Sequence, residues 1–427
     1  MLIMVIAFVV LLFLGVPLLF SMGLSSVLYF ITSDSVSLLS IIPERFLNGM
    51  DSFVIMAIPL FTFMGLLMSK GGISNDLIDF VNIFVGRFRG GLAYTNVFVS
   101  TIFGGISGSA FADVGSECAT LVPIMEKTGY DKEFSAAITV ASSVQSPLIP
   151  PSIPALVVSG IAGVSVSSMF MSGLVPGLLM ALVCALVTFF RTKQRNYPRY
   201  EGKFTLKAAF RATRKAFFAL LTPLIVLGGT LFGFFTVTES GAIAVAYALI
   251  ICFVVKKLKG SEFLDIIKET VRVSAMTYIL LAVIQVFAWI IANEQIPLIA
   301  TEWLLSLSNN VNVLLLLLMV FLLIWGMWMD VTAAILIFGP LLFPIFTGFG
   351  VHPVHLGAIL VFSLCIGLQT PPFGTLLFVV SSITKTSFAK LVKEMVPFYI
   401  GELILLAIIV FVPEVTLFIP RLLGLLS

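Results

Sequence analysis

Charged side chains are scarce in this sequence of 427 residues. Asp, Glu, Lys and Arg together make up 11% of it, whereas about 25% is usual for soluble proteins. Hydrophobic residues make up 59%, and the mean hydropathy is +1.16. So little charge cannot solvate the surface of a chain this long, which excludes a soluble globular domain, a disordered chain and a nucleic-acid-binding protein. The composition is that of a polytopic membrane protein in a lipid bilayer.

Cysteine and histidine are also rare, with four and two residues. The cysteines lie far apart in apolar runs, so we expect packed thiols rather than disulfides or a metal site. His352 and His355 flank Pro353 in an expected loop, where neither is placed like a metal ligand or a catalytic base. The sequence shows no nucleophile–base arrangement and no P-loop. We therefore expect no enzyme activity. Since the chain has no P-loop to hydrolyse ATP, any energy it uses is expected to come from an ion gradient or another subunit.

Apolar runs long enough to cross a bilayer of about 30 Å recur along the chain. Several exceed one crossing, so they are expected to hold two helices or a re-entrant hairpin. The sequence therefore predicts an all-α polytopic membrane protein. The runs cover roughly residues 2–31, 52–69, 74–86, 94–126, 134–190, 216–255, 274–292, 311–345, 354–383 and 396–420.

The longest polar segment, residues 191–215, divides the chain into a first half, 1–190, and a second half, 216–427. It carries nine Lys or Arg residues against one acid, Glu201, so the positive-inside rule places it in the cytoplasm. From Lys203 to Lys215 a basic residue recurs every four positions with Phe and Leu between. This pattern is typical of an amphipathic helix on the inner leaflet, and a solvated connector is compatible with it.

The two halves share Gly and Pro positions at a spacing of 221 residues, which predicts a duplication. Lys and Arg flank the first repeated block, whereas the equivalent flanks of the second have none, so we expect an inverted-topology repeat. The matching positions include Gly105 with Gly326, Pro123 with Pro344, Gly129 with Gly350, and Pro150–Pro151 with Pro371–Pro372.

Each block is expected to contain a helical hairpin followed by a broken helix. The hairpins cover about 94–126 and 311–345, and the broken helices about 134–165 and 354–383. Gly and Pro interrupt these helices, and the backbone groups they free need partners at membrane depth. Half-helix N-termini favour an anion, while carbonyls and hydroxyls suit a small cation. Alternatively, the hydroxyls only bond back to their own helices.

Ionisable residues inside apolar runs are candidates for function. Asp330 lies at the second hairpin tip, where the repeat partner is Ser109; it could ligate a cation, bond substrate or titrate. Asp113 and Glu117 share one helix face and either cap that helix or line a cavity. Glu239 follows a Thr-Val-Thr sequence and is expected to be a cap or hinge.

Several short motifs of this sequence occur together in one known family. They are Phe103–Asp113 (FGGISGSAFAD), Leu148–Ser152 (LIPPS), Thr222-Pro223, Thr238-Glu239, Asp330–Ala333 (DVTA) and Thr370–Gly374 (TPPFG). They resemble those of the large membrane subunit (the M subunit, DctM-like) of TRAP transporters, and the similarity covers essentially the whole chain. One departure is Ser146-Pro147, where the family more often has a glycine before Ile-Pro-Pro-Ser.

This resemblance implies sodium-driven uptake of a carboxylate across the bacterial inner membrane by an elevator-type movement. Substrates of the family include C4-dicarboxylates and sialic acid, and the overall similarity leans towards the sialic-acid members. The implied partners are a small four-helix membrane subunit (Q) and a periplasmic substrate-binding protein (P). The alternative is a proton-coupled or binding-protein-independent anion transporter of the same superfamily; an ion channel or a membrane enzyme is disfavoured.

We expect sodium ions (Na+) where each hairpin tip meets the broken helix of its own half, with the substrate carboxylate between the tips. The substrate would contact Ser107, Ser152 and Asp330 or its bound ion. The expected ligands are Ser107, Gly108, Ser109, Ser143 and Ser146 for the first ion, and Gly326, Met329, Asp330, Gly367 and Thr370 for the second.

Overall fold

The computed structural model describes residues 2–33, 40–51, 55–199, 205–255 and 258–426. These residues form helices joined by turns and loops, without a strand. Six of the helices are long and apolar enough to cross a membrane, and the number rises to eight if each of two bent pairs is one span. The prediction of an all-α polytopic membrane protein is confirmed.

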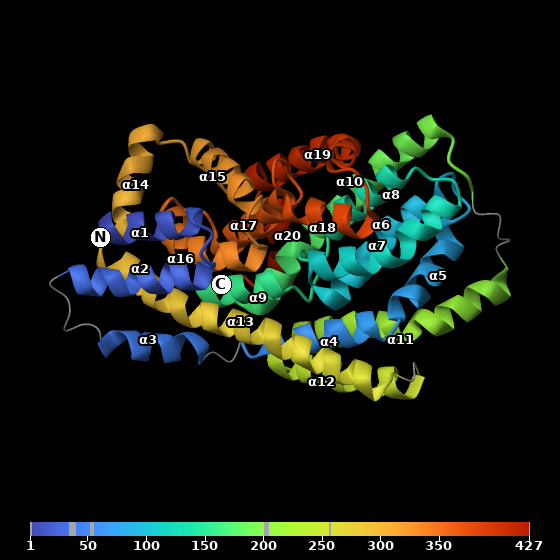
Figure 1. The fold of residues 1–427 in the computed structure, drawn as a ribbon, viewed down its shortest axis with the longest axis horizontal. Helices are drawn as coiled ribbons and strands as arrows, with labels where there is room; N and C mark the ends of the chain where they lie inside the picture. Colours follow the sequence, from blue (N-terminus) through green and yellow to red (C-terminus); the bar gives the residue numbers. More distant parts are fainter. Residues whose placement is uncertain (1, 34–39, 52–54, 200–204, 256–257, 427) are drawn as a thin grey trace.

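One group of helices, here called the support layer, lies along the lower side of Figure 1. In it, α13 packs against α2, α3 and α4, while α12 packs against α4 and α11. The short helix α1 (Leu2–Phe13) packs on α2. The support layer consists of α2 (Leu18–Thr32), α3 (Ile41–Met50), α4 (Ala57–Lys70), α11 (Leu206–Leu231), α12 (Val237–Ile250, continued by a π-helical turn Ile251–Val255) and α13 (Gly260–Asn293).

The second group, the hairpin bundle, lies above the support layer in Figure 1. It contains two helical hairpins, two broken helices and the long helices that follow them. Its members are α6 (Gly91–Ser107), α7 (Ala110–Lys127), α8 (Lys132–Ser143), α9 (Ile153–Ala162), α10 (Val166–Arg195), α15 (Val311–Gly326), α16 (Val331–Gly348), α17 (Pro353–Leu368), α18 (Thr375–Thr384), α19 (Phe388–Phe411) and α20 (Glu414–Leu422).

Two short helices lead from the support layer into the hairpins. Helix α5 (Ile73–Val85) precedes α6, and α14 (Ile296–Leu307) precedes α15 after a bend of 114°. They lie at opposite ends of the molecule in Figure 1. The order of short helix, hairpin, broken helix and long helix therefore occurs twice, and α16 begins 221 residues after α7.

Glycine and proline explain where the repeated helices stop. Gly108 ends α6 with φ +59°, and Gly374 precedes α18 with φ +52°. Residues that have a Cβ atom rarely adopt these backbone conformations. The Pro-Pro pairs at 150–151 and 371–372 fall inside the two breaks, and both bonds are cis. The hairpins and breaks thus lie where the sequence predicts them, within a few residues.

The basic linker is divided differently from the prediction. Arg191–Arg195 forms the end of α10, and Leu206–Lys215 begins α11, which continues to Leu231. The expected separate amphipathic helix is therefore the first part of a longer helix, with Leu206, Phe210 and Phe217 exposed. Lys203 lies outside the described residues.

Two smaller expectations are met, and a third is wrong. The cysteines Cys118, Cys184, Cys252 and Cys365 are free and buried. Glu239 forms a capping box with Thr236 at the start of α12. The predicted loop around Pro353 is wrong, because α17 begins at Pro353: His352 is its N-cap residue and His355 lies within the helix, where it hydrogen-bonds Thr416 at 2.8 Å.

Candidate functional site

A cavity of about 220 Å³ lies where the two hairpin tips and the two breaks meet the support layer. Ser109 of the first tip and Asp330 of the second line it, although 221 residues separate them. Two threonines of the support layer, Thr62 and Thr277, add hydroxyl groups to its lining. Further lining residues are Ile58, Gly108, Ala110, Phe111, Pro147, Ile153, Pro154, Val273, Val331, Thr332 and Leu368.

Three helices begin at this cavity: α7, α9 and α16. Ser152 caps α9 by accepting from the Ala155 N–H, and Asp330 caps α16 by accepting from Thr332 at 2.9 Å. By contrast, the N-cap residue of α7, Ser109, makes no capping bond through its side chain. The N–H groups of a first helical turn have no partner within the helix and carry partial positive charge. The start of α7 is thus the position in the cavity best suited to an anion.

The first tip packs directly on the first break. A Cβ on Gly104 would lie 2.8 Å from the Cα of Ser146, and one on Gly108 would lie 2.7 Å from the Pro151 carbonyl oxygen. At the tip itself the Ser109 N–H donates to the Ser107 hydroxyl over 3.4 Å. The tip that carries Ser107, Gly108 and Ser109 therefore packs on the break that carries Ser146, and their assignment as sodium ligands stays a prediction.

The second tip and break approach each other just as closely. A Cβ on Gly367 would lie 2.6 Å from the Cα of Gly326. Asp330 and Met329 also line a second, more apolar cavity of about 500 Å³ with Trp325, Trp328 and residues of α1 and α2. Asp330 therefore faces the shared cavity between the tips and the apolar one beside it.

Three hydroxyls that were expected to bind sodium or substrate instead donate to backbone carbonyls near them in the chain. Ser143 donates to the Val140 carbonyl at 2.8 Å, and Thr370 donates to the Ile366 carbonyl at 2.7 Å. Ser152 donates to the Pro147 carbonyl at 2.5 Å while it caps α9, and it is 1% exposed. These bonds match the alternative that the hydroxyls serve their own helices, so carbonyls near them are better ligand candidates than their side chains.

Thr62 is a cavity residue that sequence reasoning missed. Its side chain is buried, and its hydroxyl has no hydrogen-bond partner among the described residues. Buried hydroxyls are normally bonded, so one left open in a cavity suits a ligand. A threonine in an apolar helix gives no sequence signal, since its importance depends on what the tertiary fold places opposite.

Behind the first tip, the helices α6, α7 and α8 enclose a buried polar network. Ser146 donates to Asp113 at 2.8 Å, and Ser100 donates to Glu117 at 2.9 Å. Asp113 therefore faces the break rather than capping α7, and neither acid lines the cavity between the tips. From Ser100 the network continues through Ser142, Asn96 and Thr139, and a separate hydrogen bond joins Thr101 to Gln145.

A third buried acid, Glu402 of α19, was missed by sequence reasoning. It accepts a hydrogen bond from the Gln369 side chain, and Tyr399 donates to the Gln369 backbone carbonyl. This set ties α19 to the second break. The signal was visible, because Glu402 lies within the apolar run 396–420.

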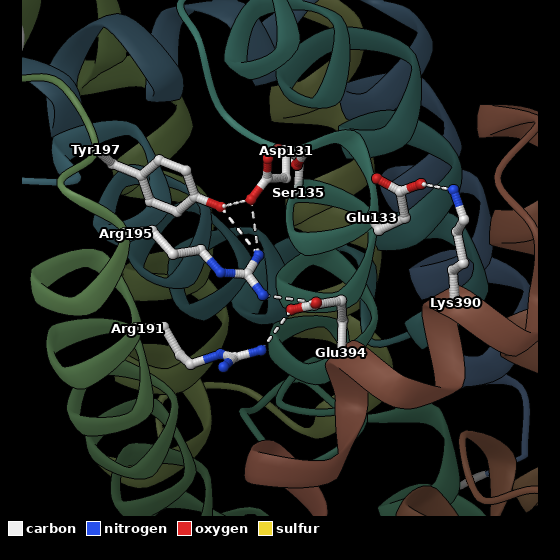
Figure 2. Close-up of polar contacts among 8 residues, drawn as sticks. All are labelled: Asp131, Glu133, Ser135, Arg191, Arg195, Tyr197, Lys390 and Glu394. Carbon is white, nitrogen blue, oxygen red and sulfur yellow. Dashed lines mark hydrogen bonds and ion pairs between the residues drawn. The ribbon is translucent and has the colours of Figure 1, made fainter.

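Far from the cavity, an ion-pair cluster joins α8 and α10 to α19 (Figure 2). Glu394 accepts from Arg191 at 2.7 Å and from Arg195 at 2.6 Å, and Arg195 also bonds Asp131 at 2.8 Å. Burial and the hydrogen bond to Asp131 raise the pKa of Tyr197 to about 12, so the phenol stays neutral and remains a donor at physiological pH. The cluster lines a charged hollow of about 660 Å³.

Comparison with known proteins decides the family. Residues 5–415 match the family described as the DctM component of the tripartite ATP-independent periplasmic transporter. The chain belongs to this family. This match confirms the resemblance that the motifs indicated. It also confirms the prediction of a multi-pass membrane protein.

Two relatives of the DctM-family chain show how far the similarity extends. The sialic acid TRAP transporter large permease protein SiaM of Vibrio cholerae is 34% identical over 413 residues, 96% of each chain. The C4-dicarboxylate TRAP transporter large permease protein DctM of Pseudomonas aeruginosa is 34% identical over 407 residues, 95% of this chain and 94% of the relative. Both are named as permeases, which confirms that the chain is not an enzyme.

The fold is shared more widely than the sequence. The crystal structure of the YdaH transporter of Alcanivorax borkumensis superposes with a TM-score of 0.62 at 16% identity, covering 89% of both chains.

Proposed function

We propose that this chain is the translocating subunit of a sodium-coupled uptake system for a small carboxylate, and that the cavity between the hairpin tips is its binding site. The observation that carries the proposal is the start of α7, which no side chain of the described residues caps and which opens into this cavity. The substrate carboxylate would accept from N–H groups of that first turn.

The substrate class follows from the relatives and from the cavity chemistry together. SiaM is named for sialic acid and the Pseudomonas relative for C4-dicarboxylates, and both of these substrates carry carboxylates. A second polar group of either substrate has a partner in the open hydroxyl of Thr62. We propose an acid of this class, and sialic acid and a C4-dicarboxylate are the two substrates to compare in the uptake assay.

Sodium ions would bind at the two places where a tip contacts a break. Hydroxyl and carbonyl oxygens around Ser107, Ser109 and Ser146 supply hard ligands to the first ion. The Asp330 carboxylate, with carbonyls near Gly326 and Gly367, supplies them to the second. An ion beside Asp330 would offset the charge that otherwise repels an anionic substrate, so binding of the two is coupled.

The arrangement of the molecule supports an elevator movement of inverted repeats. The hairpin bundle carries both tips, both breaks and the cavity-facing acid, while the support layer contributes only one wall. We propose that the bundle slides against the support layer in the bacterial inner membrane. The small four-helix subunit would extend the support layer, and a periplasmic binding protein would deliver the substrate.

The test is uptake into proteoliposomes that contain this chain and its small membrane subunit, with substrate-loaded binding protein outside. An inward sodium gradient is compared with choline at the same pH and osmolarity. We expect saturable uptake of the acid with sodium and background uptake with choline. Equal uptake in choline, or uptake that follows an imposed pH gradient alone, would overturn the sodium coupling.

A further inference from the structure

The polar network behind the first tip contains two carboxylates that form no ion pair with any Lys, Arg or His residue that the structure describes. Asp113 and Glu117 lie four residues apart on the face of α7 that meets α6 and α8, and they are 0% and 1% exposed. They lie close enough to interact electrostatically with each other.

Neutral hydroxyls surround the pair but do not saturate it. Ser146 donates to one oxygen of Asp113, while Ser100 donates to one oxygen of Glu117 and faces Asp113 as well. Asp113 Oδ1 and Glu117 Oε1 are buried and have no hydrogen-bond partner in the described part of the chain. Each carboxylate thus presents one open oxygen.

Burial makes these open oxygens costly unless a ligand fills the space. An ionised carboxylate away from water is retained only when it is paired or coordinates a metal. Two carboxylates on adjacent turns of one helix also repel each other. The shell around them consists of oxygen atoms, which hard cations prefer over soft ones.

We propose that Asp113 and Glu117 bind a sodium ion through their two open oxygens, with the Ser100 hydroxyl as a further ligand. This position lies behind the proposed first tip site, on the side of Ser146 that bonds Asp113, and its two carboxylates are not among the ligands proposed for the tip ions. The inference rests on the proposed sodium coupling for the identity of the ion.

The proposed ion would hold the first hairpin closed on the first break. Ser146 bonds Asp113, and the same residue packs against Gly104 near the end of α6. With the ion bound, Asp113 keeps a fixed position beside α8, and Ser146 is held against the tip. Loss of the ion would weaken the packing of Ser146 against the first tip, although no substrate contact is removed.

Equilibrium binding of radioactive sodium to the purified chain with its small membrane subunit tests this site. The variants are Asp113→Asn, Glu117→Gln and the double variant; these substitutions preserve side-chain size. Glu126→Gln is the matched control, since Glu126 is an exposed acid on the same helix. We expect the double variant to bind one sodium ion fewer than the wild type, and each single variant to raise the Kd of that ion about tenfold or more.

A milder variant keeps the test valid if the acid variants fold poorly. Ser100→Ala retains both carboxylates, so we expect an unchanged number of ions and a weaker affinity for one of them. If the acid variants do not fold, wild-type sodium affinity in Ser100→Ala would overturn the site; if they fold, a wild-type ion count in the double variant would overturn it. If the wild type binds no sodium, sodium coupling fails as well; if wild type and double variant bind it equally, only this site fails.

Discussion

Ser109 and Asp330 occupy equivalent places in the two halves and line the same cavity, but only Asp330 caps the helix that follows it with its side chain. Asp330 caps α16 with its carboxylate, whereas Ser109 leaves the first turn of α7 without a side-chain cap. The second tip thus carries a negative charge and suits a cation, while the first presents free N–H groups and suits an anion. This difference allows one cavity to hold a carboxylate and sodium together.

Ser109→Asp should block substrate binding without harming the fold. The new carboxylate would cap α7, which stabilises a helix by about 0.5–2 kcal/mol relative to a residue that does not cap. It would also place a negative charge where the substrate carboxylate binds. We expect kcat/KM for uptake to fall at least about tenfold and the apparent Tm to stay the same or rise.

The control for Ser109→Asp is Ser165→Asp. Ser165 already caps α10 with its side chain, and it does not line the cavity. Uptake by this variant should match the wild type. Normal uptake by Ser109→Asp would contradict binding of the substrate carboxylate at the start of α7.

Thr62→Val should weaken substrate binding while leaving stability unchanged or improved. The Thr62 hydroxyl has no hydrogen-bond partner in the part of the chain that the structure describes, and one hydrogen bond to substrate is worth about 0.5–1.5 kcal/mol, so KM should rise several-fold. Thr120→Val is the matched control, because the Thr120 hydroxyl is bonded to the Ser116 carbonyl. Uptake kinetics that are the same in both variants would contradict a substrate contact at Thr62.

Gly367→Ala should force the second tip away from its break. The added Cβ would lie 2.6 Å from the Cα of Gly326, and overpacking of this kind costs about 1–3 kcal/mol. Thermal unfolding in detergent should show a lower apparent Tm, with reduced sodium-dependent uptake. In Gly228→Ala the new Cβ meets nothing within 4 Å, so that variant should unfold like the wild type.

Glu394→Gln should loosen the ion-pair cluster of Figure 2. Two arginines lose their shared carboxylate, and hydrogen bonds to charged groups contribute about 1.5–3 kcal/mol each. We expect a lower apparent Tm. Asp265→Asn removes an exposed partner of Lys268 and should change stability by less than about 0.5 kcal/mol; an equal effect of both variants would contradict the role of the cluster.

The sequence was sufficient for the repeated architecture because Gly and Pro act locally. Gly108 and Gly374 adopt positive φ where helices end or begin, and the Pro-Pro pairs fall in the breaks, whereas the single prolines Pro123 and Pro344 lie inside α7 and α16. At the 221-residue spacing Gly105 corresponds to Gly326 and Ser146 to Gly367. In each half the break packs on the end of the preceding hairpin helix, at Gly104 in the first half and at Gly326 in the second.

Side-chain partners were harder to predict, because they depend on packing between distant segments. Asp113 could be read as a helix cap until its partner Ser146, 33 residues later, was seen. Ser143, Ser152 and Thr370 have the right chemistry for ligands, but their hydroxyls bond to backbone carbonyls nearby. Thr62 enters the cavity from a helix outside the repeated hairpins, so no motif pointed to it.

Asp330→Asn provides the most direct test of the site between the tips. Asparagine retains the capacity to cap α16 but removes the charge that would bind sodium and couple it to the substrate. In proteoliposomes with a sodium gradient, we expect uptake by Asp330→Asn to fall to the level seen in choline. The exposed acid variant Glu302→Gln should transport normally. Wild-type, sodium-dependent uptake by Asp330→Asn would contradict the assignment of this cavity as the coupled sodium and carboxylate site.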